Sequence, residues 1–462
     1  MHPPFRLAAA AAATLASVGA FAQASTEAQS ITVTGHYDNA VGTSDAASQG
    51  TINRELLKSR PALRPGEVLE FVPGLIVTQH SGDGKANQYF LRGFNLDHGT
   101  DFATRVNGMP VNMPTHGHGQ GYTDLNFLLP ELVQRIDYRK GPYFASNGDF
   151  SSAGSADIVY LKKLDAPFGQ FTLGQDHFRR GVAGTSFDVA PEVTLLGVVE
   201  LQRTDGPWSV PERLKKDNAV FTLSGGTGAQ GWSASLMGYK ASWTATDQVP
   251  QRLIDSGSFN GQPFGRFDSL DPTTGGDTTR SSLSAEWHGD SASGRTKVSA
   301  YAIRYRLDLN SNFTYALERP ADGDQFKQSD QRSIYGADAS QTFNHVLGGF
   351  NARSEIGATL RHDRIRVGLF DSVARQITAT TRDDEVRETL FGVYAQTALE
   401  LKSGLRAVAG LRADHVQSRV DALSLAANGG RSSDTQVSPK LSLIAGPFNK
   451  TEFFFKDRKS VV

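Results

Sequence analysis

The chain has 462 residues, a formal net charge of −1 and no cysteine. The near-neutral charge gives no support to a nucleic-acid-binding protein, and the lack of cysteine excludes a disulfide framework and thiol chemistry. Glycine contributes 47 residues, and no run of them resembles a flexible linker, which favours a fold with many tight turns.

Residues 1–24 have the pattern of a secretory signal peptide. Arg6 supplies a positive charge, residues 7–21 are apolar and alanine-rich, and Ala22-Gln23-Ala24 places small residues at a cleavage site. The alternative is a short membrane anchor, but the apolar stretch falls short of the ~20 residues that a spanning helix needs. We therefore expect an exported chain. No later stretch is apolar enough for a transmembrane helix, so any membrane span is expected to be a β-barrel.

Residues 25–46 are polar and rich in small side chains, and we expect them to be flexible. They contain one strand-prone island, whose β-branched residues favour an extended peptide. The alternative is an incidental strand-like stretch in a tail. The island consists of Ser30, Ile31, Thr32, Val33, Thr34 and Gly35.

A small mixed α/β domain is expected over residues 47–163. Residues 64–75 predict a short helix, which Pro65 can begin and which a Pro-Gly pair ends. A buried strand is expected directly after it. Three further strand-like runs each lead into a glycine turn. The runs are 88–91, 101–106 and 133–138, and the turns contain Gly93, Gly108 and Gly141.

Residues 112–124 form a loop rich in histidine and glycine, and this loop is the candidate site. Its glycines keep the backbone open, and its two imidazoles stand two residues apart, so both can ligate one transition metal. Two other interpretations stay open: contact with a substrate through hydrogen bonds and ring stacking, and a purely structural loop. The substrate-binding candidates are His98, His116, His118, Gln120, Tyr122 and Asp124, and the metal-ligand candidates are His116 and His118.

From residue 168 onward the hydrophobic period is two. Residues 301–310, 391–401 and 405–412 alternate between apolar and polar side chains, which predicts strands with an apolar face toward lipid and a polar face toward the interior. Short turns alternate with long polar loops, one of which is expected at residues 371–388. A soluble β-sandwich does not separate its loops by length in this way. About twelve strands are expected between residues 168 and 448, with boundaries uncertain by a few residues.

The block at residues 88–158, with its glycine turns and His/Gly loop, resembles the plug of TonB-dependent outer-membrane receptors. The resemblance implies a mainly β fold: a small mixed α/β plug at 47–163 inside an antiparallel transmembrane β-barrel. That barrel has 22 strands in the family, and about half of it is expected within 164–453. Residues 454–462 are expected to be a non-native tail on a truncated chain.

The same resemblance assigns roles to several residues. It identifies Ser30–Gly35 as the TonB box, the peptide that a periplasmic energy-coupling protein binds as an added strand. It places Arg92 and Lys140 where family plugs carry arginines that pair with barrel glutamates. Lys140 weakens this role because a lysine cannot offer the bidentate fork of an arginine.

The resemblance implies active import rather than catalysis. We expect an outer-membrane receptor that binds a scarce extracellular solute, such as a ferric siderophore or another metal chelate, and imports it with energy from a TonB-type partner. Its partners would also include outer-membrane lipid, and no cofactor is expected. One alternative is a passive porin or a surface-binding barrel. Another is a secreted enzyme with His116, Asp124 and Ser151 as a triad, although no G-x-S-x-G motif accompanies them.

Overall fold

The computed structural model describes residues 44–45, 48–62, 64–79, 84–244, 247–259, 261–402 and 404–458. The chain divides into two compact units, residues 1–35 and 36–462, and all described residues belong to the second. The predicted signal peptide and the segment Ser30–Gly35 lie outside the described residues. Within the described part of the chain, no helix combines the length and the apolar character that crossing a membrane requires.

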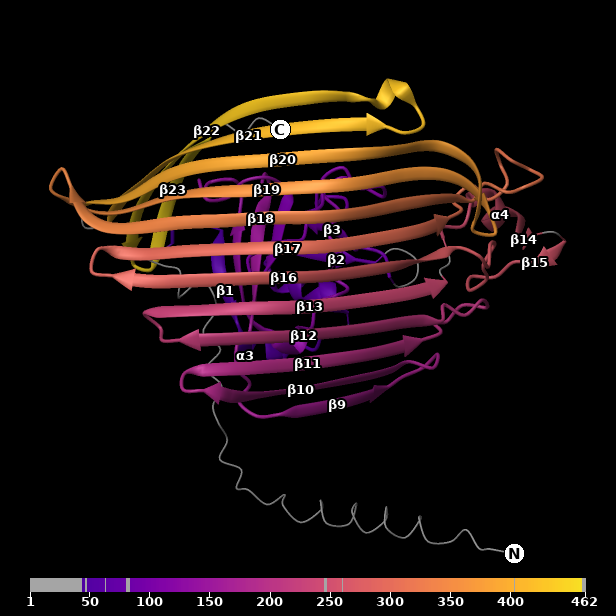
Figure 1. Cartoon of the computed structure of the whole chain (residues 1–462), viewed down its shortest axis with the longest axis horizontal. Coiled ribbons are helices and arrows are strands. Elements are labelled where there is room, and N and C mark those ends of the chain that lie inside the picture. Colours follow the sequence, from indigo (N-terminus) through magenta and orange to yellow (C-terminus); the bar gives the residue numbers. More distant parts are fainter. Residues whose placement is uncertain are drawn as a thin grey trace, which may run out of the picture. The chain divides into compact units, whose positions relative to one another are not determined.

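A sheet of 13 antiparallel strands, which we call the wall, dominates the second unit. Each strand pairs with the next wall strand along the chain (Figure 1). Twelve of these strands lie between Phe168 and Phe448, as the sequence predicts. The wall strands are β9 (Phe168–Leu173), β10 (Arg179–Ala190), β11 (Val193–Thr204), β12 (Leu214–Gly226), β13 (Gln230–Thr244), β16 (Gly275–Ser291), β17 (Gly294–Ser311), β18 (Phe326–Leu347), β19 (Phe350–Val373), β20 (Gln376–Lys402), β21 (Leu405–Ala422), β22 (Gly430–Phe448) and β23 (Thr451–Arg458).

The two ends of the wall differ in their connections. Two- or three-residue turns join the strands at one end, for example at 191–192, 227–229 and 292–293. We call this the short-turn end and the opposite one the long-loop end. Longer connections lie at the long-loop end, apart from the turn between β19 and β20, and the one between β13 and β16 carries three small elements that project from the wall (Figure 1). They are α4 (Gln251–Ser256), β14 (Ser258–Phe259) and β15 (Gln262–Pro263).

The prediction of a long loop at residues 371–388 is wrong. Strands β19 and β20 continue through this segment and are joined only by Ala374 and Arg375, with φ values of 48° and 68°. Two successive residues with positive φ make the type of tight hairpin turn that usually carries Asn and Gly. Neither residue type is present here, so the sequence gives no sign of the turn.

Elements β1 to β8 form the domain that resembles a plug, and we call it the plug. It contains a five-stranded sheet in the order β1-β7-β8-β5-β6 and a three-stranded sheet in the order β2-β3-β4. The predicted short helix is the 3-10 helix η1 (Pro65–Phe71). The other elements are β1 (Gln49–Asn53), α3 (Arg54–Ser59), β2 (Leu75–Thr78), β3 (Gln88–Leu91), β4 (Phe94–Asn95), β5 (Phe102–Val106), β6 (Met109–Pro110), η2 (Pro130–Leu132), β7 (Val133–Lys140) and β8 (Gly154–Tyr160).

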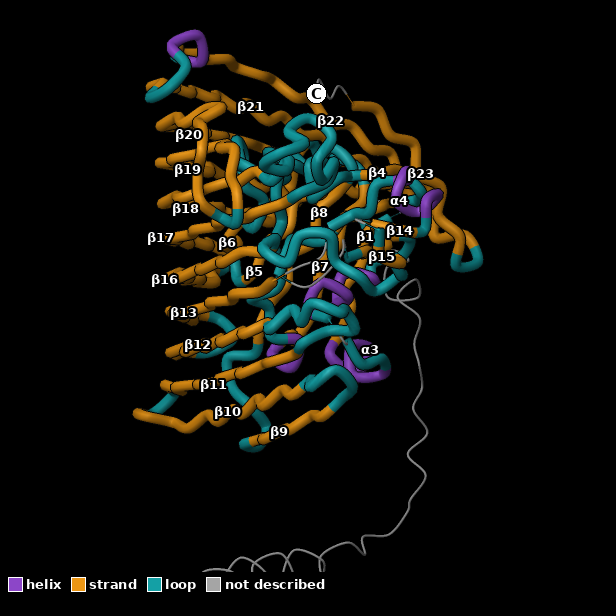
Figure 2. The backbone as a smooth tube through the Cα atoms, turned by 90° about the vertical axis from the view of Figure 1, so that its right-hand side faces the viewer, coloured by secondary structure: helices purple, strands orange, loops and turns teal. Residues whose placement is uncertain are grey.

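The plug lies on the concave side of the wall (Figure 2). A single cluster of buried apolar side chains runs from the plug into the wall strands β10 to β18. Gly84 of the plug shows how close this packing is, because a Cβ there would lie 2.3 Å from the ring of Trp243 in β13. The plug and this part of the wall therefore share one hydrophobic core.

The outward face of the wall matches the prediction in some strands and contradicts it in one. Phe391 and Val393 of β20 are 46% and 41% exposed on the outer face, as expected for side chains that meet lipid. The apolar residues of β17 are instead buried in the core shared with the plug, from Tyr301 to Leu309, so their predicted orientation is wrong. Alternation shows that a strand has two different faces, but only the position of the plug decides which apolar face turns inward.

Candidate ligand-binding site

The His/Gly loop connects β6 to η2 and is closed by its own backbone. Met113 and Tyr122 form an isolated β-bridge, and the Gly121 amide donates to the Met113 carbonyl at 3.0 Å. A Cβ at Gly117 would lie 3.1 Å from the carbonyl oxygen of Ser329 in β18, which is tighter than an ordinary contact. Glycine therefore lets the loop approach the wall closely, near the long-loop end of β18.

Four of the six predicted binding residues form one cluster of rings. The imidazole of His116 stacks on Tyr122, with ring centroids 4.0 Å apart and planes 4° apart. His118 meets the edge of Tyr122 at 5.6 Å and lies 4.7 Å from the ring of His98. The wall adds Tyr305 of β17, which lies 5.7 Å from His116.

Polar side chains of β18 hold the loop in place. Gln328 contacts Nδ1 of His118 at 2.8 Å and donates from Nε2 to the Gly117 carbonyl at 2.8 Å. Arg332 donates to the carbonyls of Pro114 and Thr115 at 2.7 and 3.2 Å. Neither of these two wall residues is predicted as a site residue from the sequence.

The buried members of the cluster are electrically unusual. Burial lowers the pKa of His116 to about 3, so its imidazole is neutral at physiological pH, although Nε2 lies 3.9 Å from a carboxylate oxygen of Asp330. Burial raises the pKa of Asp124 to about 6 and also raises the pKa of Tyr122. The Tyr122 hydroxyl accepts a hydrogen bond from the Ala86 amide at 3.0 Å. Burial therefore disfavours the charged forms of His116, Tyr122 and Asp124.

The geometry gives the metal prediction limited support. The backbone amide of His118 donates to Nδ1 of His116 at 3.1 Å, which leaves Nε2 as the nitrogen of His116 that can ligate. Among the described residues there is no group of three or more His, Cys, Asp or Glu side chains placed to hold a metal ion. A direct metal role for His116 and His118 stays a prediction.

Gln120 differs from the rest of the set because it is exposed. It lines a cavity of about 440 Å³ between the plug and the wall strands β19 to β22, which also includes Arg361 and Arg412. Each of these arginines binds an aspartate two residues later, at 2.7 Å in both cases. Residues two apart in a strand share a face. The spacing Arg-x-Asp is therefore the sequence pattern by which Arg361 and Arg412, which were not predicted, could have been found.

Arg92 and Lys140 contact the plug itself. Arg92 donates to the Ser48 hydroxyl at 3.0 Å, and Lys140 donates to the Pro73 carbonyl at 2.8 Å. Their role in locking the plug to wall glutamates stays a prediction. Other ion pairs do hold the plug: Arg180 of β10 pairs with Glu131 at 2.6 Å, and Asp247 of the connection between β13 and β16 pairs with Lys85 at 2.7 Å.

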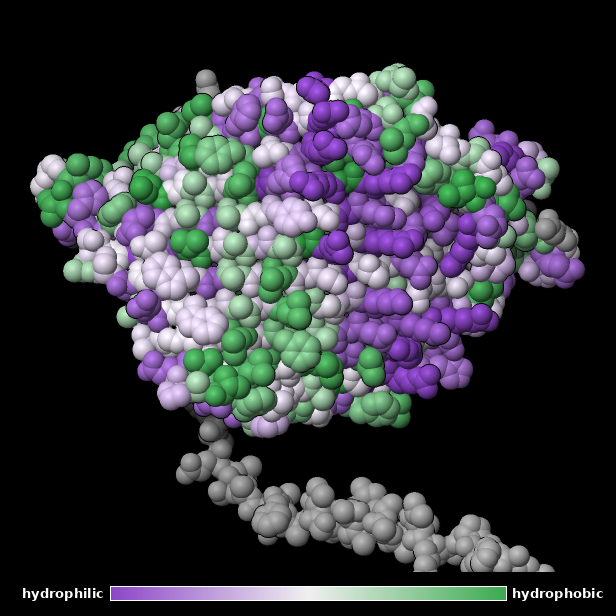
Figure 3. Space-filling view, in the orientation of Figure 1, coloured by the Kyte–Doolittle hydropathy of each residue, from purple (hydrophilic) through white to green (hydrophobic). Residues whose placement is uncertain are grey.

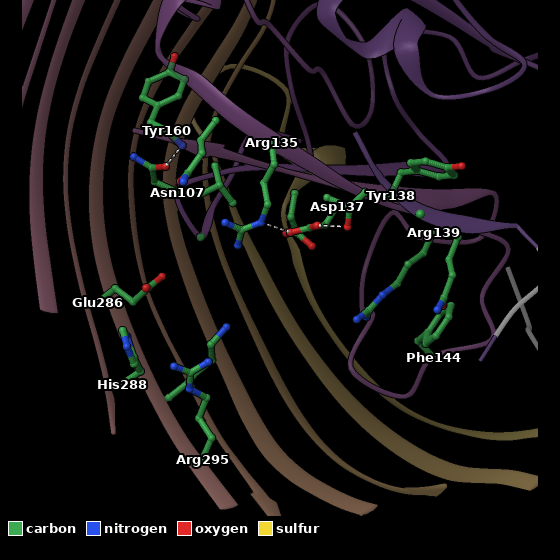
Figure 4. Close-up of a pocket in the computed structure, with 18 of the residues that line it drawn as sticks. Asn107, Arg135, Asp137, Tyr138, Arg139, Phe144, Tyr160, Glu286, His288 and Arg295 are labelled. Carbon is green, nitrogen blue, oxygen red and sulfur yellow. Dashed lines mark hydrogen bonds and ion pairs between the residues drawn. The ribbon is translucent and has the colours of Figure 1, made fainter. Parts of the chain in front are cut away.

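A second, larger cavity of about 900 Å³ lies between the plug and the short-turn end of the wall. Figure 4 shows Glu286, His288 and Arg295 of the wall on one side of it and the plug residues Arg135 and Asp137 on the other. Arg135 binds Asp137 at 2.9 Å. Charged groups of both signs line this space, so it favours water.

Comparison with known proteins follows the same division of the chain. Residues 42–155 match the TonB-dependent receptor plug domain, and residues 209–454 match the TonB-dependent receptor-like β-barrel. The fold is similar to that of the ferric citrate transporter FecA in its unliganded form, with a TM-score of 0.71 and 12% identity over 87% of this chain and 60% of FecA.

Two further crystal structures show the same fold. The ferric-catecholate import receptor Fiu from E. coli K12 has a TM-score of 0.67 and 13% identity over 86% of this chain and 67% of Fiu. The siderophore receptor PiuA from Acinetobacter baumannii has a TM-score of 0.67 and 13% identity over 87% of this chain and 62% of PiuA. This chain thus spans about 60% of the length of FecA. The matches to both domains show that the chain belongs to the TonB-dependent receptor family.

Proposed function

We propose that this protein acts in the outer membrane as an active import receptor for a scarce extracellular solute. The observation that carries the proposal is the position of the plug, which is packed into the concave side of the wall through a shared apolar core. A passive pore needs an open lumen, and a plug held against the concave side of the wall would occupy that space in a closed barrel. Import then requires an energy source that rearranges the plug, and a TonB-type protein bound at Ser30–Gly35 is the partner that family membership supports.

We place the solute at the long-loop end, which we assign to the cell exterior. Membrane-spanning barrels have short periplasmic turns and longer extracellular loops, and the His/Gly loop contacts Gln328 and Arg332 near that end of β18. Gln120 is the exposed member of the candidate set and lines the cavity beside Arg361 and Arg412. A ferric siderophore or another metal chelate is the solute class that we propose, and no catalytic step is needed.

Two hydrogen bonds of Thr115 connect the exposed Gln120 to the wall. A solute that contacts Gln120 lies beside Thr115, whose amide donates to the Gln120 side chain at 2.8 Å and whose hydroxyl donates to Glu388 of β20 at 2.6 Å. Displacing Gln120 therefore disturbs a contact between the plug and the wall. We propose that His98, His116, His118, Tyr122 and Asp124 act in this coupling as well as in any direct contact with the solute.

Deletion of Ser30–Gly35 in the full-length receptor tests the coupling to TonB. We expect uptake of radiolabelled ferric chelate to stop while binding of the same chelate to whole cells is unchanged. A second variant keeps the length of the chain and changes Ile31 and Val33 to proline, which cannot donate the backbone hydrogen bonds of a strand, and it should lose uptake in the same way. Normal uptake by either variant would contradict the proposal.

The contribution of the loop is tested by changing both His116 and His118 to alanine. Loss of a hydrogen bond to a charged group costs ~1.5–3 kcal/mol, or about one to two decades in affinity. We expect a loss of this size in a chelate titration of the purified receptor. His415→Ala, at an exposed position of β21, is the matched control. Equal affinity in the double variant and the wild type would leave the loop with a structural role alone.

A further inference from the structure

A row of arginines crosses the outer face of the wall. The strand register places Arg304 of β17 opposite Ser333 of β18, Ser333 opposite Arg364 of β19, and Arg364 opposite Arg387 of β20. The same row continues to two further arginines on β21 and β22, Arg419 and Arg431. We call these five arginines, together with Ser333, the arginine row.

The arginine row faces away from the plug. Its neighbour Arg332 in β18 is fully buried and contacts plug carbonyls, so Ser333, the next residue, points outward. Arg304, Arg364 and Arg387 are all exposed and line one hollow of about 550 Å³. Figure 3 shows hydrophilic residues gathered over this half of the outer face, toward the long-loop end.

Within the described part of the chain, the central arginines of the row have acidic neighbours but no direct ion-pair partner: Glu385 lines the same hollow, and Asp421 interacts electrostatically with Arg387. Among the described residues, Arg304, Arg364 and Arg387 form no salt bridge, whereas Arg419 binds Asp421 at 2.7 Å. Arg364 and Arg387 also stand directly opposite each other, and like charges at opposite positions destabilise a sheet. The row is thus an exposed concentration of positive charge that an anion would stabilise.

The depth of the row on the wall indicates what kind of anion it meets. Leu360 of β19 and Phe391 of β20 are 45% and 46% exposed on the same outer face and stand opposite each other. Arg364 follows Leu360 by four residues, which is about 13 Å along a strand. The arginines therefore lie just beyond the apolar band on its long-loop side, at the level of lipid headgroups rather than of acyl chains.

We propose that the arginine row binds the phosphate groups of a phosphorylated glycolipid in the outer leaflet. Guanidinium groups bind phosphate through paired hydrogen bonds and suit it better than lysine does. From Arg304 to Arg387 the row crosses three interstrand spacings, about 14 Å, which is wide enough for a headgroup with two phosphates. The proposal rests on the outer-membrane location given under the proposed function, but not on the transported solute.

The test uses the full-length receptor extracted in mild detergent, with the bound lipid A measured by mass spectrometry. We expect the double variant Arg364→Ala/Arg387→Ala to retain about tenfold less lipid A than the wild type, because each arginine contributes charge-assisted hydrogen bonds. Arg382→Ala is the matched control, since it removes an exposed arginine of β20 outside the row. Equal retention by the double variant and the wild type would overturn the proposal.

Vesicle binding separates the possible anions. The wild-type receptor should prefer phosphatidylcholine vesicles that contain lipid A over vesicles of phosphatidylcholine alone and over vesicles with dephosphorylated lipid A. Loss of this preference in millimolar inorganic phosphate would assign the row to free phosphate, and capture of an acidic protein without lipid would assign it to a protein partner. Either outcome would overturn the glycolipid proposal. Chelate uptake is measured in parallel, so its failure bears only on the proposed function.

Discussion

The plug meets the two halves of the wall through different chemistry. Toward β10–β18 the boundary contains a continuous apolar core, in which Ile303 and Ile334 are 2% and 0% exposed, beside a few polar contacts such as that of Arg180 with Glu131. Toward β19–β22 it consists of polar contacts and a cavity of about 440 Å³. There, Arg361 donates to the carbonyl of Asn112 at 2.8 Å, and Gln396 accepts from the amide of Ala145 at 3.2 Å.

This difference indicates which side of the plug can move. Separating an apolar core costs about 25 cal/mol of free energy for each Å² of apolar surface that becomes exposed to water. A hydrogen bond beside a wet cavity is readily replaced by one to water, so its net contribution to stability is small. We therefore expect the plug to stay attached to β10–β18 and to part first from β19–β22. Four experiments test this comparison.

The largest effect is expected at Arg332, where the two halves meet. Its side chain is fully buried, pairs with Asp330 at 2.6 Å and with Asp363 at 3.5 Å, and donates to the plug. Removing one partner of a buried ion pair costs about 3–5 kcal/mol, since it leaves uncompensated charge. Arg332→Ala should lower the free energy of unfolding by this amount. The measurement is a urea titration followed by tryptophan fluorescence, to which Trp243 beside the plug contributes.

The control for Arg332 is Arg135→Ala. Arg135 and its partner Asp137 are 42% and 39% exposed, and pairs of this kind contribute about 0–1 kcal/mol. An Arg332→Ala variant no less stable than this control would show that the junction does not anchor the plug.

The apolar half should respond strongly to a cavity. Ile303→Ala removes a side chain from the shared core and is expected to cost about 2–5 kcal/mol in the same urea experiment. Ile356→Ala removes the same atoms from a position of β19 that is 49% exposed, and its cost should be clearly smaller. Equal costs would mean that the core between plug and wall is not packed more tightly than the outer face.

Matched amide deletions compare the two halves directly. On the apolar side, Asn218 donates to the buried carbonyl of Phe127 at 2.6 Å, and its loss leaves that carbonyl dry, at a cost of about 1–3 kcal/mol. On the polar side, Gln396 lines the cavity of about 900 Å³, so its truncation to alanine should let water reach the buried Ala145 amide, and we expect a cost of less than about 1 kcal/mol. Limited proteolysis should also cut the plug faster in Asn218→Ala. The reverse order would contradict the assignment of the yielding side.

The smallest effect concerns pH. Burial lowers the pKa of His116 to about 3, so below the unfolded value of ~6.5 the unfolded chain binds more protons and stability falls, by about 1 kcal/mol between pH 7 and 5.5. Burial raises the pKa of Asp124 to about 6, and its protonation in the folded state adds stability over the same window. The two effects oppose each other in the wild type.

Single variants separate these two titrations. Asp124→Asn should reveal the loss of stability on acidification, and His116→Phe, which keeps a ring against Tyr122, should reveal the gain. Urea midpoints at pH 7 and 5.5 measure both. Identical pH profiles for the two variants would show that neither group titrates as described.

Much of the fold follows from local sequence. The plug strands β3 and β7 begin at their predicted residues, 88 and 133, and the η1 helix lies within its predicted segment, because alternation, Pro65 and the glycine turns act over a few residues. The turn at Asn107 and Gly108 has φ values of 47° and 77°, as its composition favours. The hairpin at Ala374 and Arg375 was missed because its turn carries no such signature.

The candidate site was only half predictable. Sequence singled out His98, His116, His118 and Tyr122, and the structure brings their rings together. Nothing in the sequence indicated that His116 would be fully buried or that Gln328 and Arg332, more than 200 residues away in the chain, would hold the loop.

The sequence by itself determined most of the strand segments, the positions of the tight glycine turns and the residues of the His/Gly loop, because these depend on neighbours along the chain. The tertiary structure alone decided which face of each wall strand turns inward. Tyr305 and Phe391 both belong to alternating apolar runs, yet Tyr305 is 4% exposed against the plug and Phe391 is 46% exposed outside. A period of two is the same for either orientation, and only the plug packed on one side distinguishes them.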